Sequence, residues 1–418
     1  MTKSGAICFF LLMKFYTFQK KTKIMKRYLI LLIVLFSAID NYAQYSWTVK
    51  NDFPSNRYAT SFFVIGNRGY VGLGNNGSGQ NEWWEYNPVI DTWTRKADYP
   101  IANVWAAACF SINGKGYVIS GTTGPYISAF YEYDPVTDLW TQKANFPGSP
   151  RQDAAYFELN KQGYISCGYG GTYFNDLWQY DPLPNTWTQK ASLPSNSRTG
   201  PSSFVINNFA YVGLGFQNGN TFQDFYSYNA ANDVWVRIAD FPGQSRNSAA
   251  SFTYDGLGFC GLGYNNTATY FTDFYSYDEN SNTWTQQQNY PGPPTSYVFA
   301  FPLGESAYVG TGRGPGYVYR NEVYQLTRNS SGFEYEIETP QIATLFYNIS
   351  GPSLKLNNEF LNDVTLNIYN ISGQLIYYSN VNSLQLISLS ELTKFSTGTY
   401  VYKITSGKHT QTGKFSIY

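Results

Sequence analysis

Residues 180–194 read YDPLPNTWTQKASLP: the end of one predicted strand, a polar turn and a second strand built around Trp187. The tryptophan recurs with gaps of 46, 47, 47, 48 and 49 residues, each time heading a near-copy such as TWTRKADYP or LWTQKANFP. The six positions are Trp47, Trp93, Trp140, Trp187, Trp235 and Trp284. A second series of strands, typified by YVGLG, begins at Tyr70, Tyr117, Tyr164, Tyr211, Phe259 and Tyr308. A spacing this regular indicates a repeat architecture.

Each unit contains four short apolar or aromatic stretches separated by Gly, Asn and Asp turns, which predicts one small antiparallel sheet of four strands. The aromatic content of 19% also favours strands, because flat, stiff side chains suit a pleated surface. Four strands in a repeat of about 47 residues are typical of a propeller blade, which buries its faces only against neighbouring blades. We therefore expect an all-β protein.

The two ends of the repeat region complement each other. The first tryptophan segment, at Trp47, has no glycine-rich strand before it, and the last glycine-rich strand, at Tyr308, has no tryptophan strand after it. If the N-terminal strand pairs with the last unit, a sixth blade is completed and no sheet edge stays open. The sequence thus predicts a six-bladed β-propeller over residues 44–328, closed by its N-terminal strand.

Glycines after an aromatic–aliphatic strand, then segments such as YEYDP and WQYDP, then tryptophan, resemble kelch repeats over about two thirds of the chain. The resemblance implies the same propeller fold. The chain departs from the kelch pattern in its glycine pair, which is mostly split (GLG rather than GG). Glycine at these places still permits close backbone approach, so the expected fold is unchanged.

The N-terminal residues 1–43 are predicted to form a signal peptide region, with Met25 as the expected true start. From Met25 the sequence runs from a basic pair, KR, into the apolar stretch YLILLIVLFSA and then to the small residue Ala43. This apolar stretch is short for a bilayer span, and an uncleaved membrane anchor is the alternative interpretation.

After residue 328 the repeat is lost. Residues 329–352 are predicted to be a linker, and residues 353–418 a small β-sandwich, because apolar residues alternate between Ser-Gly and Thr-Gly turns. The order IYNISGQLIY, ISLSELTKFSTGTYVYKI and a terminal GKFSIY is similar to the C-terminal sorting domain of type IX secretion in Bacteroidetes. The resemblance implies a secreted or outer-cell-surface protein and the type IX export machinery as a partner. A carbohydrate-binding or fibronectin-like sandwich is the alternative.

Composition argues against several functions. Lys plus Arg and Asp plus Glu balance at 28 each, so there is no positive field to attract nucleic acid. His409 is the only histidine of the whole chain, which leaves the propeller without the usual metal ligand and general base. Secreted kelch propellers include copper-radical oxidases, but these need two histidine ligands. No cofactor or metal is therefore expected, and an enzyme is the less favoured reading.

The cysteines and a set of aspartates have structural explanations. Cys109, Cys167 and Cys260 are an odd number and are expected to be small buried residues, although one pair could form a disulfide. Three aspartates at one blade position suggest a calcium or acid site, but their repetition favours hydrogen bonds to backbone N–H groups of the turn. They are Asp176, Asp224 and Asp273.

A more informative position lies thirteen residues before each glycine-rich strand's aromatic residue. Its occupants are Arg57, Val104, Arg151, Arg198, Arg246 and Thr295. Equivalent residues lie at equivalent radii, so we expect the four arginines near one mouth of the central channel, where they could hold a carboxylate or a sulfated sugar. Alternatively, they tie adjacent blades together through backbone carbonyls.

The copies also disagree at two neighbouring positions. Val104 is followed by Trp105, which could stack on a sugar. Asp153 stands where the other blades have Ala59, Ala106, Gly200, Ser248 and Tyr297. These two residues join the arginines as ligand-binding candidates at the channel mouth.

Three functions remain. The favoured one is a secreted or cell-surface, non-catalytic module that binds a glycan or a protein through loops on one propeller face. The second is an enzyme acting on an acidic sugar, because six-bladed kelch relatives include sialic-acid epimerases; Arg151 and Asp153 would then act. The third is a structural or adhesive matrix protein.

Overall fold

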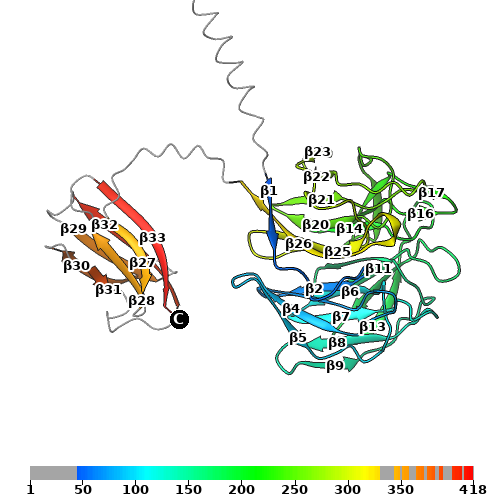
Figure 1. The fold of residues 1–418 in the computed structure, drawn as a ribbon, viewed down its shortest axis with the longest axis horizontal. Coiled ribbons are helices and arrows are strands. Elements are labelled where there is room, and N and C mark those ends of the chain that lie inside the picture. The colour runs from blue at the N-terminus through cyan, green and yellow to red at the C-terminus, as the bar shows by residue number, and fades with distance from the viewer. Residues whose placement is uncertain are drawn as a thin grey trace, which may run out of the picture. The chain divides into compact units, whose positions relative to one another are not determined.

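The computed structural model describes residues 45–329 and, in the C-terminal part, residues 343–348, 351–356, 364–370, 374–381, 386–388, 398–406 and 409–417. The chain divides into two compact units, residues 1–329 and 330–418 (Figure 1). The predicted signal peptide region lies outside the described residues. Within them, no helix is long and apolar enough to cross a membrane.

Blades 1 to 5 of the first unit are consecutive four-stranded antiparallel sheets. Blade 1 contains β2 (Ser61–Ile65), β3 (Arg68–Gly72), β4 (Trp83–Asn87) and β5 (Thr92–Lys96). Blade 2 contains β6 (Ala108–Ile112), β7 (Lys115–Ile119), β8 (Phe130–Asp134) and β9 (Leu139–Gln142). Blade 3 contains β10 (Ala155–Leu159), β11 (Gln162–Ser166), β12 (Leu177–Asp181) and β13 (Thr186–Lys190). Blade 4 contains β14 (Ser202–Ile206), β15 (Phe209–Gly213), β18 (Phe225–Asn229) and β19 (Val234–Arg237), with the small hairpin β16 (Phe216–Gln217) and β17 (Asn220–Thr221) in its loop. Blade 5 contains β20 (Ala250–Tyr254), β21 (Leu257–Gly261), β22 (Phe274–Asp278) and β23 (Thr283–Gln287).

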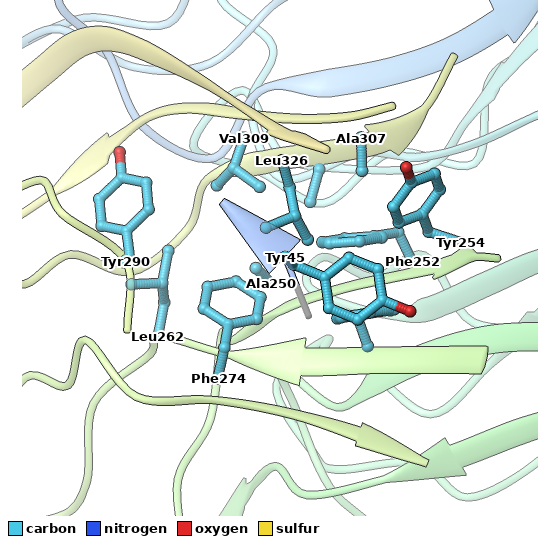
Figure 2. Close-up of a cluster of buried hydrophobic side chains, with 12 residues drawn as sticks. Tyr45, Ala250, Phe252, Tyr254, Leu262, Phe274, Tyr290, Ala307, Val309 and Leu326 are labelled. Atoms are coloured by element: carbon cyan, nitrogen blue, oxygen red, sulfur yellow. The ribbon is translucent and has the colours of Figure 1, made fainter. Parts of the chain in front are cut away.

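Blade 6 joins the two ends of the propeller. It contains β24 (Phe299–Pro302), β25 (Ala307–Arg313), β26 (Tyr319–Arg328) and the N-terminal β1 (Tyr45–Lys50), with a short 3-10 turn, η1 (Pro315–Tyr317), between β25 and β26. Figure 1 shows the blue β1 beside the yellow β26, and Trp47 is paired with Leu326. Tyr45 is fully buried among Leu326, Phe252 and Phe274 (Figure 2). The predicted six-bladed propeller closed by its N-terminal strand is confirmed.

The repeated tryptophans connect neighbouring blades. In all six, the indole N–H donates to a backbone carbonyl of the preceding blade, over 2.8–3.3 Å. Trp187, for example, donates to Ala144 and packs edge-on against Phe130 and Phe146. The repeat that revealed the fold is therefore a repeated inter-blade contact.

Two rings of backbone hydrogen bonds surround the propeller axis. In the first, which we call the inner ring, each N–H donates to the carbonyl of the preceding blade over 2.8–3.1 Å, and φ is between 50° and 60°. The inner ring consists of Ala59, Ala106, Asp153, Gly200, Ser248 and Tyr297. In the second ring, the last glycine of each GLG-type motif donates to the next blade over 2.8–3.1 Å. These glycines have φ between 84° and 115°, a conformation that favours glycine, so the split pair keeps the glycine that the close approach requires.

The C-terminal unit contains two antiparallel sheets, as expected for a small β-sandwich. One has the order β30 (Leu375–Val381), β29 (Val364–Asn370), β32 (Gly398–Ser406) and β33 (His409–Ile417). Val364, Leu366 and Ile368 alternate with more exposed residues and are buried, which gives this sheet an apolar face. The other sheet has the order β27 (Ala343–Asn348), β28 (Gly351–Leu356) and β31 (Leu386–Ser388). β27 lies inside the expected linker, residues 329–352, and pairs with β28, so the second unit begins earlier than predicted.

Candidate functional site

The central channel contains a cavity of about 100 Å³ between the inner ring and two aromatic side chains. All six inner-ring residues line it. Phe62 from blade 1 and Tyr156 from blade 3 also line it, and their ring centroids lie 5.9 Å apart. Because these blades are not adjacent, the two rings meet across the channel and close the cavity on one side. The loops that follow β3, β7, β11, β15, β21 and β25 surround the other side, which we call the mouth.

Asp153 is the one charged member of the inner ring, where it is half-buried at φ 50°. Its carboxylate accepts a hydrogen bond of 2.9 Å from the Gln152 side-chain amide. Burial raises the pKa of Asp153 to about 6, against the opposing effects of this hydrogen bond and of the Arg313 charge. The cavity rim therefore carries a carboxyl group that titrates near neutral pH.

Arg313 is the last residue of β25 in blade 6, at the mouth, where its backbone pairs with Ser296. The guanidinium carbon is 5.0 Å from the ring centroid of Tyr58, 5.2 Å from that of Tyr297 and 4.9 Å from that of Tyr317. Tyr264 is slightly further away, at 5.9 Å. The buried Nε of Arg313 has no hydrogen-bond partner. We call these four tyrosines the tyrosine cage.

Aromatic side chains continue on both sides of the mouth. In blades 2 to 4 they form a chain in which Tyr126 contacts Tyr169, Tyr169 contacts Tyr173, and Tyr173 contacts Phe216, with centroid separations of 4.9–6.3 Å. On the other side, Tyr270 and Tyr319 stack on members of the tyrosine cage. Most of these rings are half-buried, so the mouth is broad, aromatic and accessible to a ligand.

The structure corrects the expected placement of Arg57, Arg151, Arg198 and Arg246, which we call the paired arginines. Their side chains are at most 1% exposed, and each forms an ion pair with a carboxylate of its own blade. Arg198 is representative: it donates to the Leu214 carbonyl over 2.9 Å and to both carboxylate oxygens of Asp224, and its guanidinium lies over Phe222. The spacing identified the blade position correctly, but these side chains point into the blades and not into the channel.

The same contacts revise the expectation for Asp176, Asp224 and Asp273. These carboxylates accept hydrogen bonds from the paired arginines and not chiefly from turn N–H groups. Burial opposes ionisation of Asp224, but the hydrogen bond and charge of Arg198 hold its pKa below the usual value. In the described part of the chain, no group of three or more acidic, His or Cys side chains could hold a metal ion. Cys109, Cys167 and Cys260 are buried free thiols.

The remaining candidate, Trp105, lies at the mouth, where its backbone pairs with Thr122 over 3.1 Å, and its side chain is half-buried. Arg313 is not among the site residues predicted from the sequence. The sequence does contain a pattern that points to Arg313. In each blade, the residue that directly follows the last glycine of the GLG-type motif occupies an equivalent position. Its occupants are Asn75, Thr122, Tyr169, Phe216, Tyr264 and Arg313. Alignment of the loops at this position would have shown one arginine among mainly aromatic residues.

Comparison with known proteins supports export and the fold. Residues 350–418 match the secretion system C-terminal sorting domain family. Proteins with this domain are exported through type IX secretion, so the protein is secreted or located at the outer cell surface. A solved structure titled "Structure of YjhT" is similar to the propeller, with a TM-score of 0.59 and 15% identity over 66% of this chain and 95% of that chain. At this identity the likeness concerns the fold alone. No curated protein matches the chain.

Proposed function

We propose that this exported, kelch-like propeller is a non-catalytic module that binds a glycan at the mouth of its central channel. The observation that carries the proposal is the accessible aromatic lining of the mouth, above all the chain Tyr126, Tyr169, Tyr173 and Phe216. Tyrosine combines an apolar ring face with a hydroxyl group, and sugars likewise combine apolar C–H faces with hydroxyl groups. A concave, mostly preformed site with a few charged groups is the usual form of a ligand site.

The position of the aromatic residues supports this function over a purely structural one. The fully buried aromatic residues pack inside and between blades, as Tyr45 does. Tyr169 and Phe216, in contrast, lie in loops whose backbone pairs with the segment leading into the inner strand of the same blade. Loops on a rigid scaffold are the usual place for binding residues.

The test is a glycan screen with the exported full chain. Tyr169→Ala removes a ring from the middle of the aromatic chain and is expected to weaken binding about tenfold, the effect of losing a contact worth about 1.4 kcal/mol. Tyr378→Ala is the matched control, because Tyr378 is an exposed tyrosine of the C-terminal unit. A wild-type chain that binds no glycan, or equal losses in the two variants, would contradict the proposal.

Asp153 favours an enzyme acting on an acidic sugar as a second candidate. A carboxyl group whose pKa is about 6 suits general acid–base catalysis near neutral pH. Arg151, the expected partner, is occupied by Asp176, so Arg313 would be the guanidinium that acts with Asp153. NMR spectra of acidic monosaccharides incubated with the wild type and with Asp153→Asn test this candidate. If the two proteins leave every sugar unchanged, catalysis is rejected and the binding function stands.

A further inference from the structure

Arg313 differs from every other arginine of the propeller. Residues 45–329, all of which the structure describes, contain ten arginines, and nine of them have a carboxylate oxygen within 4.0 Å. Arg313 is the tenth and forms no ion pair within these residues. Its side chain is half-buried and its Nε is fully buried without a hydrogen-bond partner. An unpaired, partly desolvated guanidinium is costly unless something pairs with it.

The tyrosine cage explains how Arg313 is held without a carboxylate. Tyr58, Tyr297 and Tyr317 each place a ring centroid within about 5 Å of the guanidinium carbon, so the cation lies over aromatic faces. In each contact the cation lies over an aromatic ring and not beside a carboxylate. A guanidinium also has N–H groups in its plane, with the fork geometry that matches a carboxylate or a sulfate. The cage therefore orients the cation and does not neutralise it.

The charge of Arg313 lowers the pKa of Asp153 against the effect of burial, but the two form no ion pair. It is held by Gln152 in the inner ring, so it adds negative charge to the cavity rim without pairing with the guanidinium. A bound anion at Arg313 would be attracted by the arginine and repelled by ionised Asp153. Arg313 thus supplies a cation without an ion pair beside the titratable Asp153, and the chain Tyr126, Tyr169, Tyr173 and Phe216 supplies uncharged aromatic rings.

We propose that Arg313 is the anion subsite of the mouth and that the ligand is an acidic glycan, with its carboxylate or sulfate group bound by Arg313. Its neutral sugar units then lie on the aromatic chain of blades 2 to 4. The inference rests on the proposed glycan-binding function and adds the ligand's charge and orientation. The inner ring supports a location of this subsite next to the cavity, because Tyr297 lines the cavity and its ring also contacts the Arg313 guanidinium.

The experiment compares matched probes on the full chain: oligogalacturonate against its methyl ester, and sulfated dextran against unsulfated dextran. Wild-type protein should bind at least one acidic probe about tenfold or more tightly than its neutral counterpart, as expected for a charge-assisted bidentate contact. Arg313→Gln should abolish this preference, and Arg313→Lys should restore part of it. Arg68→Gln is the control: Arg68 is the first residue of β3, at the end of blade 1 that lies away from the mouth. Its loss should leave the preference for the acidic probe unchanged.

Asp153→Asn tests the anion subsite independently if the Arg313→Gln variant does not fold. Removal of the competing negative charge should tighten binding of the acidic probe at pH 7, a gain that a merely structural role for the two residues would not produce. Equal binding of acidic and neutral probes, or an acidic preference that survives Arg313→Gln, overturns the inference and leaves glycan binding intact. Binding of none of the probes or other glycans overturns both proposals. The carboxylate and sulfate arms identify which acid the subsite takes.

Discussion

The propeller uses arginine in two ways, and the paired arginines differ from Arg313 in burial and in ion pairing. Arg198 is buried, bound to both oxygens of Asp224 and to a backbone carbonyl, and it recurs with the same partners in other blades. Arg313 is half-buried, surrounded by tyrosines and found in one blade only. Repetition of a residue in a propeller therefore indicates a structural contact that several blades share. A residue that occurs in one blade only does not make such a shared contact, so it can instead contact a ligand.

The contrast extends to the backbone. The carbonyl that Arg198 binds belongs to Leu214, a non-glycine residue at φ 58°, just before the glycine of its motif. The guanidinium thus satisfies a carbonyl in a region where the backbone leaves the regular sheet. Arg151 and Arg246 make the same contact to Cys167 and Leu262. The paired arginines stabilise the turn that sets up the mouth, while Arg313 lies on its surface.

The largest expected difference concerns stability. Arg198→Met leaves the half-buried Asp224 without its partner and should lower the free energy of unfolding by about 3 kcal/mol. Arg313→Met strands no carboxylate and should change it by about 1 kcal/mol or less. Chemical denaturation followed by tryptophan fluorescence measures this, because all ten tryptophans of the chain lie in residues 45–329. The double variant Arg198→Met/Asp224→Leu should recover part of the loss. Equal effects at Arg198 and Arg313 would remove the distinction between them.

The tryptophans offer the same comparison at a smaller scale. Trp187→Phe removes an indole N–H that donates to the Ala144 carbonyl over 3.0 Å, along with part of the packing on Phe146, and should cost about 1–2 kcal/mol. Trp105→Phe alters a residue outside the tryptophan repeat and should cost about 0.5 kcal/mol or less. Thermal melting of the two variants beside the wild type is sufficient. A larger loss for Trp105 than for Trp187 would contradict the link between repetition and structure.

The sequence predicted what the repeat determines and missed what depends on side-chain direction. Blade number and closure by the N-terminal strand follow from period and phase, and these expectations agree with the structure. The spacing of thirteen residues that identified Arg198 gives its blade and its position along the propeller axis. A side chain at that position can point into the channel or into the blade. The partner that decides, Asp224, lies 26 residues further on, across a loop of variable length. Arg313 directly follows the last glycine of its motif, but the blades carry different residues at this position, so no repeated residue type marks it.

Asp153 allows the smallest effect and the most specific measurement. Its pKa in the folded protein is about 6, above the ordinary value of 3.8, so the folded state binds the proton more tightly than the unfolded state. Stability should therefore fall as pH rises from about 4 to about 6, by about 1 kcal/mol, since the cavity rim is partly solvated. Asp153→Asn should remove this part of the pH dependence and be the more stable protein above pH 6. Affinity for a sulfated probe should fall as pH rises through and above about 6 in the wild type and stay constant in Asp153→Asn, because the ionised carboxylate repels the bound anion. If Asp153→Asn keeps the pH profile of the wild type, the titrating group is not Asp153. The proposed repulsion between Asp153 and a bound anion would then be wrong.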